Sequence, residues 1–132
     1  MQNTAGVIVD TSVWVDYLRG RNSGRATPLA ELINQRQAIL CGIVLAEILN
    51  GVRSPQERLH LNDLLNALPY RETSRHTWLR AGELAHSLRS QGFPTPLSDL
   101  ILAALALEHR CALLTYDRHF HRIPRLPLYQ PA

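Results

Sequence analysis

The sequence predicts an α/β fold in which a central parallel β-sheet carries helices on both faces. Short apolar runs that are typical of buried strands alternate along the chain with runs whose apolar residues recur at helical spacing. This alternation favours a parallel sheet. The 132 residues suit one domain, and no internal repeat or low-complexity tract divides them. We therefore expect a single domain over 1–132, with residues 1–5 disordered.

The first strand and the first helix surround an acidic residue. The apolar run at 7–9 predicts a buried strand, and the apolar residues within 13–18 fall near helical spacing. We expect Thr11 or Ser12 to cap this helix at its start. Asp10 would then stand just past the carboxyl end of the strand, where open α/β sheets bind their ligands. The alternative is that Asp10 serves only as a helix cap.

The remaining elements follow from the apolar runs and from the residues that punctuate them. Pro28 suits a first helical turn, Gly92 suits the end of a helix, and Ser98 is expected to cap a helix that begins at Asp99. Helices are predicted over 28–36, 43–51, 56–68, 73–91 and 99–108, and strands over 37–42, 69–72, 111–115 and 126–129.

The helical patterns also predict which side chains are buried. Trp14 lies on an apolar helix face, so we expect it to pack in the core rather than to stack on a base. Leu59, Trp78 and Leu79 fall on the apolar stripes of their helices and are expected to point inward. Asp16 is expected to be a surface charge.

The composition excludes several classes of function. All 14 basic residues are arginine, so no lysine can serve a phosphate-binding loop or a Schiff base. Arginine offers a planar donor fork suited to phosphate, and the net charge of +3 points weakly to an anionic partner. Cys41 and Cys111 lack the spacing of a disulfide framework or a metal site and are expected in the core. Since no signal peptide or membrane span is apparent, we expect a cytoplasmic protein.

Four acidic residues stand in unusual sequence contexts. Asp10 and Asp117 each follow a predicted strand, and Asp99 opens a predicted helix, where an acid can also serve the helix dipole alone. Glu47 lies in the middle of an apolar helix that we expect to be buried nearly all round. A lone buried carboxylate costs several kcal/mol unless it is paired, protonated or bound to a metal.

A parallel sheet can bring these distant acids together. Four carboxylates in one pocket repel each other, and divalent cations remove the conflict. Ligands that are all oxygen favour Mg²⁺ or Mn²⁺, and such a site suits the hydrolysis of a phosphodiester. Eleven acids less these four leaves seven against 14 arginines, so the surface outside the pocket would be basic, as in a nucleic-acid binder.

Four blocks of the sequence occur in the order and at the spacing of a known family. They are VIVDTSVWVDYLRG, IVLAEILNGV, TPLSDLILAALALEH and LLTYDRHFHRI. Together they resemble the PIN-domain ribonucleases, specifically the toxins of VapC type, and the resemblance runs from about Val7 to Pro131. It implies a PIN-like fold and a metal site. Asp10 and Asp99 would be the closest ligands, Asp117 would bind directly or through water, and Glu47 would orient a metal-bound water or contact a second metal.

The resemblance also covers hydroxyl residues beside the acids. Ser12 and Thr115 match positions whose hydroxyls commonly hydrogen-bond the carboxylates. The chain departs from the family where hydroxyl residues often precede the helix glutamate, because Cys41 and Val44 stand there.

The function implied is that of a Mg²⁺-dependent endoribonuclease, with Mn²⁺ as a possible substitute, that cleaves cellular, usually structured, RNA. A cognate VapB-like antitoxin and a homodimer are the expected partners. One alternative is a PIN nuclease that processes RNA without a toxin role. Others are a non-catalytic RNA-binding module, which predicts degraded acids, and a metal phosphatase, which predicts a second metal-binding motif.

Basic residues near the acids are candidates for contact with RNA. Arg19, Arg21 and Arg25 form the densest basic cluster, and Arg118 adjoins Asp117. A further pair, His119 and His121, either forms part of a phosphate-binding rim or lies in a solvated loop. Zinc binding by that pair is disfavoured, because no cysteine or further histidine stands at ligand spacing.

Overall fold

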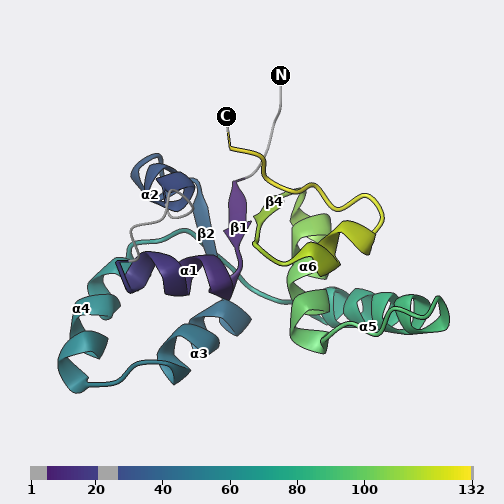
Figure 1. Ribbon diagram of the computed structural model, residues 1–132, viewed down its shortest axis with the longest axis horizontal. Coiled ribbons are helices and arrows are strands. Elements are labelled where there is room, and N and C mark those ends of the chain that lie inside the picture. Colours follow the sequence, from purple (N-terminus) through teal and green to yellow (C-terminus); the bar gives the residue numbers. More distant parts are fainter. Residues whose placement is uncertain (1–5, 21–26, 132) are drawn as a thin grey trace.

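A computed structural model describes residues 6–20 and 27–131 of the chain (Figure 1). The predicted disorder of residues 1–5 therefore concerns residues outside the described ranges. The strands are β1 (Val7–Val9), β2 (Ala38–Cys41), β3 (Tyr70–Arg71) and β4 (Ala112–Leu114). The helices are α1 (Thr11–Leu18), α2 (Thr27–Asn34), α3 (Gly42–Asn50), α4 (Pro55–Asn66), α5 (Arg75–Ser90) and α6 (Leu97–His109), followed by a 3₁₀ helix, η2 (Arg118–Arg122).

The four strands form one parallel sheet in the order β3-β2-β1-β4, which confirms the predicted fold class. Val7 is the register partner of Ala38 on one side and of Ala112 on the other. The first and last strands in sequence are thus neighbours at the centre of the molecule (Figure 1). Since all strands run the same way, the segments that follow β1 and β4 leave the sheet at the same edge.

The predicted strand at 126–129 is reduced to a single bridge. Leu128 forms an isolated parallel bridge with Leu113. The Leu113 amide donates to the Pro127 carbonyl at 2.8 Å, and the Tyr129 amide donates to the Leu113 carbonyl at 2.8 Å. Pro127 has no N–H to donate, and Pro131 follows soon after, so the ladder does not extend. The prediction was correct for the pairing and wrong for its length.

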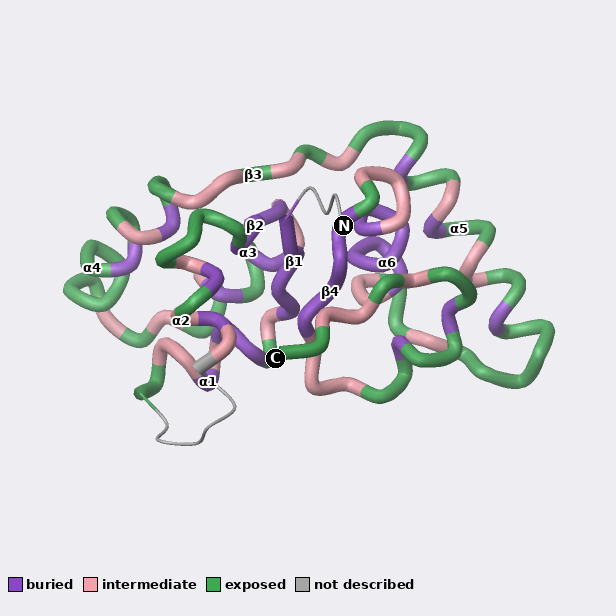
Figure 2. The backbone as a smooth tube through the Cα atoms, turned by 90° about the horizontal axis from the view of Figure 1, so that it is seen from above, coloured by how far each residue is buried: buried purple, intermediate pink, exposed green. Residues whose placement is uncertain are grey.

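The core lies in the sheet and in the helices that cover it. All residues of β1, β2 and β4 are buried, and α6 buries seven residues in succession, from Leu100 to Ala106 (Figure 2). Trp14, Cys41 and Cys111 are fully buried, as predicted. No helix within the described ranges is long and apolar enough to span a membrane.

Three apolar side chains that were predicted to point inward are exposed instead. Leu59 of α4 is 67% exposed, and Trp78 and Leu79 of α5 are 49% and 62% exposed. In α5 the inward stripe begins at Thr77, whose hydroxyl donates to the carboxylate of Glu108 in α6. That hydrogen bond fixes the rotation of the helix, so the next two residues face outward.

Two polar predictions are also wrong. Asp16 is buried, at 9% exposed, because it lies three residues after the core residue Val13 and shares its helix face. Ser98 does not cap α6, because the helix begins two residues earlier than that cap requires, with Pro96 as the cap residue and Ser98 in the first turn. Asp99 nevertheless lies in the first turn of α6, as expected.

Candidate active site at the carboxyl edge of the sheet

Asp10 follows the last residue of β1 and directly precedes the first turn of α1. It is the N-cap of α1 in place of the predicted Thr11 or Ser12, and its Oδ1 accepts the Thr11 amide at 2.8 Å. Its Oδ2 accepts the Ser12 hydroxyl at 3.2 Å and the Thr115 hydroxyl at 2.8 Å. The side chain is only 8% exposed, and burial raises its pKa while these hydrogen bonds lower it. Asp10 therefore caps α1 and also lies at the carboxyl edge of the sheet, in contact with the Ser12 and Thr115 hydroxyls.

The Thr115 hydroxyl links the ends of the neighbouring strands β1 and β4. It donates to Asp10 Oδ2 and accepts the backbone amide of Asp117 at 3.0 Å. One hydroxyl, just beyond β4, thus fixes both the Asp10 carboxylate and the start of the Asp117 turn. Ser12 and Thr115 both hydrogen-bond the Asp10 carboxylate, as the family resemblance implied.

Asp99 enters the same region from the first turn of α6. Burial, followed by the negative charges of Asp10 and Asp117, raises the pKa of its carboxyl to about 6. Glu47 acts in the same direction, and His119 opposes it. An acid at a helix N-terminus ordinarily ionises readily, so a raised pKa indicates that like charges and lost solvation dominate here.

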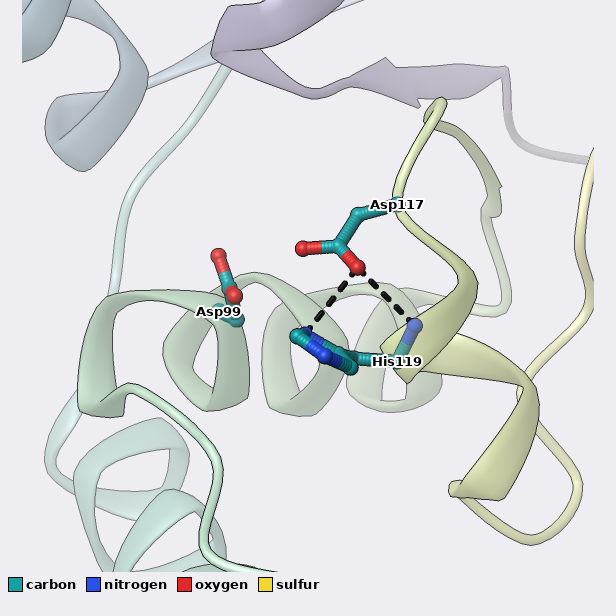
Figure 3. A group of neighbouring side chains, drawn as sticks. All are labelled: Asp99, Asp117 and His119. Carbon is teal, nitrogen blue, oxygen red and sulfur yellow. Dashed lines mark hydrogen bonds and ion pairs between the residues drawn. The ribbon is translucent and has the colours of Figure 1, made fainter.

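Asp117 caps the 3₁₀ helix η2 and faces Asp99 (Figure 3). Its Oδ1 accepts the backbone amide of His119 at 2.9 Å and lies 3.1 Å from the Nδ1 atom of the same residue. Asp99, Asp117 and His119 each offer one ligand atom, and these atoms lie within 4.8 Å of one another. The sequence analysis placed His119 in a phosphate-binding rim or a solvated loop and disfavoured zinc binding by His119 with His121. The D-x-H spacing of Asp117 and His119 was the signal that this histidine adjoins an acid.

Glu47 differs from its prediction. It is exposed on α3, and not buried, because the helix turns the side bearing Ala46, Glu47 and Asn50 outward and buries only Val44 and Ile48. The Glu47 carboxylate is still tied to the site, since its Oε1 accepts the Thr11 hydroxyl at 2.6 Å. Its charge also raises the pKa values of Asp10 and Asp99. The expected burial cost was wrong, whereas the expected proximity to Asp10 is observed.

The structure describes two of the four arginines that were proposed to bind RNA. Arg19 is exposed at the end of α1 and lines a shallow groove that also contains Glu47. Arg118 is exposed at the start of η2, next to Asp117. Arg21 and Arg25 lie outside the described residues.

The family model of the PIN domain matches residues 7–126. Ribonuclease VapC19 of Mycobacterium tuberculosis is 34% identical over 121 residues, which cover 90% of this chain and 95% of that relative. Ribonuclease VapC11 of the same species is 28% identical over 130 residues, which cover 96% and 97%. Among solved structures, a DNA-bound VapBC from Salmonella typhimurium matches with a TM-score of 0.81 at 18% identity, over 96% of this chain and 98% of that one. VapBC2 from Rickettsia felis, bound to a promoter fragment, matches with a TM-score of 0.78 at 24% identity, over 93% and 96%.

Since the family model covers most of its length, the chain belongs to the PIN domain family. Its relatives over nearly the whole chain are VapC ribonucleases, which confirms the resemblance found in the four sequence blocks and the enzyme class that it implied.

Proposed function

We propose that the chain is a divalent-metal-dependent endoribonuclease that acts in the cytoplasm as the toxin of a toxin–antitoxin pair. The observation that carries this proposal is the group of acids at one edge of the sheet. The charges of Asp10, Asp117 and Glu47 all raise the pKa of Asp99. These acids disfavour one another's ionisation, and a bound cation would relieve that repulsion. Together with the relationship to ribonucleases, this supports a metal site at this edge of the sheet.

The donor set fits Mg²⁺, with Mn²⁺ as a substitute. Asp10, Asp99 and Asp117 supply carboxylate oxygens, the ligands that these ions prefer. A divalent ion held there would supply the positive charge that activates water and stabilises negative charge developing on a phosphate. Ser12 and Thr115 would keep the Asp10 carboxylate in its orientation through their hydrogen bonds. Glu47, at the exposed side of the group, would orient the attacking water or contact a second ion.

RNA is the proposed substrate. The relatives are named ribonucleases, and 14 arginines against seven acids outside the group make the remaining surface basic. Arg19 lies in the groove that contains Glu47, and Arg118 lies next to Asp117; both are exposed and are proposed to contact phosphates. Arg21 and Arg25 are proposed for the same role on sequence grounds alone.

A VapB-like antitoxin is the proposed protein partner, because the similar structures are VapBC complexes. We also propose a homodimer. The exposed apolar side chains Trp78 and Leu79 of α5 support an interface between copies of the chain. Light scattering coupled to size exclusion should report a dimer for the wild type and a monomer for Trp78→Arg; a monomeric wild type would argue against this part of the proposal.

The enzyme proposal is tested by cleavage of total RNA. Purified protein should cut RNA with Mg²⁺ or Mn²⁺ and should stop on addition of EDTA, and mapped cleavage ends would define the target. Asp10→Asn should be inactive with an unchanged circular dichroism spectrum, whereas Glu83→Gln, an exposed acid of α5 outside the group, should remain active. Full activity of Asp10→Asn would overturn the site assignment.

The toxin role needs a separate test in cells. Induced expression of the wild type should arrest growth, and expression of Asp10→Asn should not. Harmless expression of an RNA-cleaving wild type would favour an RNA-processing nuclease instead.

A further inference from the structure

A histidine adjoins the acids of the proposed metal site. One imidazole nitrogen of His119 and one carboxylate oxygen each from Asp99 and Asp117 lie within 4.8 Å of one another. The three side chains come from η2, α6 and the turn after β4, and they point toward one another (Figure 3). Within the described part of the chain, this is the group whose donor atoms come together closely enough to surround one ion.

The spacing of two of these atoms suits neighbouring ligands of a single ion. His119 Nδ1 lies 3.1 Å from Asp117 Oδ1. Two ligands about 2.1 Å from an octahedral ion, at right angles to each other, are about 3.0 Å apart. The His119 ring is 53% exposed, so one side of the group faces solvent and leaves room for water or a phosphate oxygen.

The backbone holds the His119 ring in this position. The Asp117 side chain accepts the His119 amide, and the Asp117 amide is in turn held by Thr115. The next residue, Phe120, is buried in the core at 1% exposed and anchors η2. His121 follows on the other side of that anchor, is exposed, and is not part of the group. The two histidines therefore form a natural test and control.

We propose that His119 is a nitrogen ligand of the metal ion, alongside Asp99 and Asp117, and that it makes this enzyme select Mn²⁺ over Mg²⁺. The inference rests on the proposed function, because it adds a ligand to that site. Mg²⁺ strongly prefers oxygen, whereas imidazole raises affinity for first-row transition ions. A site with one nitrogen and several carboxylate oxygens should thus retain both ions and bind Mn²⁺ more tightly.

The test is direct metal binding to the purified protein, without RNA. Electron spin echo spectroscopy of bound Mn²⁺ should show coupling to a ligand nitrogen in the wild type and in His121→Ala, and no such coupling in His119→Ala. Isothermal titration should show that His119→Ala loses about tenfold or more in affinity for Mn²⁺ and much less for Mg²⁺. His119→Asp, which supplies an oxygen ligand in place of the nitrogen, should bind Mg²⁺ at least as tightly as the wild type and should show no nitrogen coupling.

The outcomes separate this inference from the proposed function. Mn²⁺ binding and RNA cleavage by a wild type without nitrogen coupling would overturn the role of His119 and leave the nuclease intact. Equal affinities of the wild type and His119→Ala for Mn²⁺ would do the same. A wild type that binds neither ion and cuts no RNA would overturn both. Circular dichroism should show that both alanine variants fold, since both side chains are exposed.

Discussion

Helices α3 and α6 have a similar apolar composition and different surroundings. Each is largely apolar, and each contributes one acid to the candidate site. Helix α6 packs along α5 and contacts β4 and α3, and it buries every residue from Leu100 to Ala106. Helix α3 contacts α1 and α6 but buries only Val44 and Ile48 (Figures 1 and 2).

The difference shows that burial depends on the position of a helix in the layers of the fold, and less on its composition. As a consequence, the two acids experience different environments. The Asp99 carboxyl carries a raised pKa for which burial is the largest cause. Glu47 is exposed and reaches the site through the Thr11 hydroxyl. We therefore expect Asp99 to hold the ion and Glu47 to assist from the rim.

The largest expected effect is on the rate of RNA cleavage, when substitutions of Asp99 and Glu47 are compared. Asp99→Asn should lower RNA cleavage by on the order of 10²- to 10³-fold or more, because a charged ligand is lost. Glu47→Gln should lower it by about tenfold, since an exposed group contributes less. Initial rates on one RNA substrate at saturating Mg²⁺ would measure both. A greater loss in Glu47→Gln than in Asp99→Asn would reverse the assignment of roles.

The second effect is on the free energy of unfolding, when truncated side chains in α6 and α3 are compared. Leu102→Ala in α6 should lower the free energy of unfolding by about 2–5 kcal/mol, because a fully buried side chain leaves a cavity. Leu49→Ala in α3, which is only partly buried, should cost about 1 kcal/mol. Urea unfolding followed by circular dichroism would measure both values. Similar costs would show that α3 is as buried in solution as its sequence suggested.

Much of the fold could be predicted because local patterns determine it. The apolar runs at β1, β2 and β4 are fully buried, and Gly92 follows the end of α5 as predicted, whereas the caps predicted at Ser98 and at Thr11 or Ser12 were wrong. The exposure of Trp78 could not be predicted, because it depends on the bond between Thr77 and Glu108, which lie 31 residues apart. Apolar periodicity reports the presence of a face but does not say which neighbour covers it.

The placement of some acids of the candidate site could likewise be predicted, whereas the surroundings of others could not. Acids that follow parallel strands must meet at one edge, so the meeting of Asp10 and Asp117 followed from topology. The environment of Glu47 did not, since its apolar neighbours belong to a helix that is open on one side. His119 was missed as a member of the group because its ring direction is fixed by the Asp117 turn and by burial of Phe120, which only the folded chain reveals.

A third effect concerns the stability of the metal-free protein. The folded-state pKa of Asp99 is raised from 3.8 to about 6, so between these values the folded state keeps a proton that the unfolded state has lost. The free energy of unfolding should therefore fall as pH rises through this window, by about 1–2 kcal/mol after allowance for partial exposure. Thermal melts of the wild type in EDTA from pH 4 to 7 would measure it.

The Asp99→Asn variant separates this contribution from those of other groups. Its stability relative to the wild type should increase from pH 4 to pH 7 in EDTA. Excess Mg²⁺ should reverse the sign, because the ion stabilises the ionised wild-type carboxylate. A wild type that is more stable than Asp99→Asn in EDTA at pH 7 would contradict the repulsion inferred among the acids.

The smallest effect compares the two threonines that support the acids. Thr115→Val removes a hydrogen bond to the buried Asp10 carboxylate and another from the Asp117 amide, so kcat/KM should fall by roughly tenfold. Thr11→Val removes a hydrogen bond to the exposed Glu47, where water can replace the hydroxyl, and the fall should be about twofold. Valine keeps the shape of threonine in both cases, so the difference reports the hydrogen bonds. Equal losses would mean that the exposed Glu47 depends on the Thr11 hydroxyl as strongly as the buried Asp10 depends on the Thr115 hydroxyl. The difference in burial between α3 and α6 would then have no counterpart in catalysis.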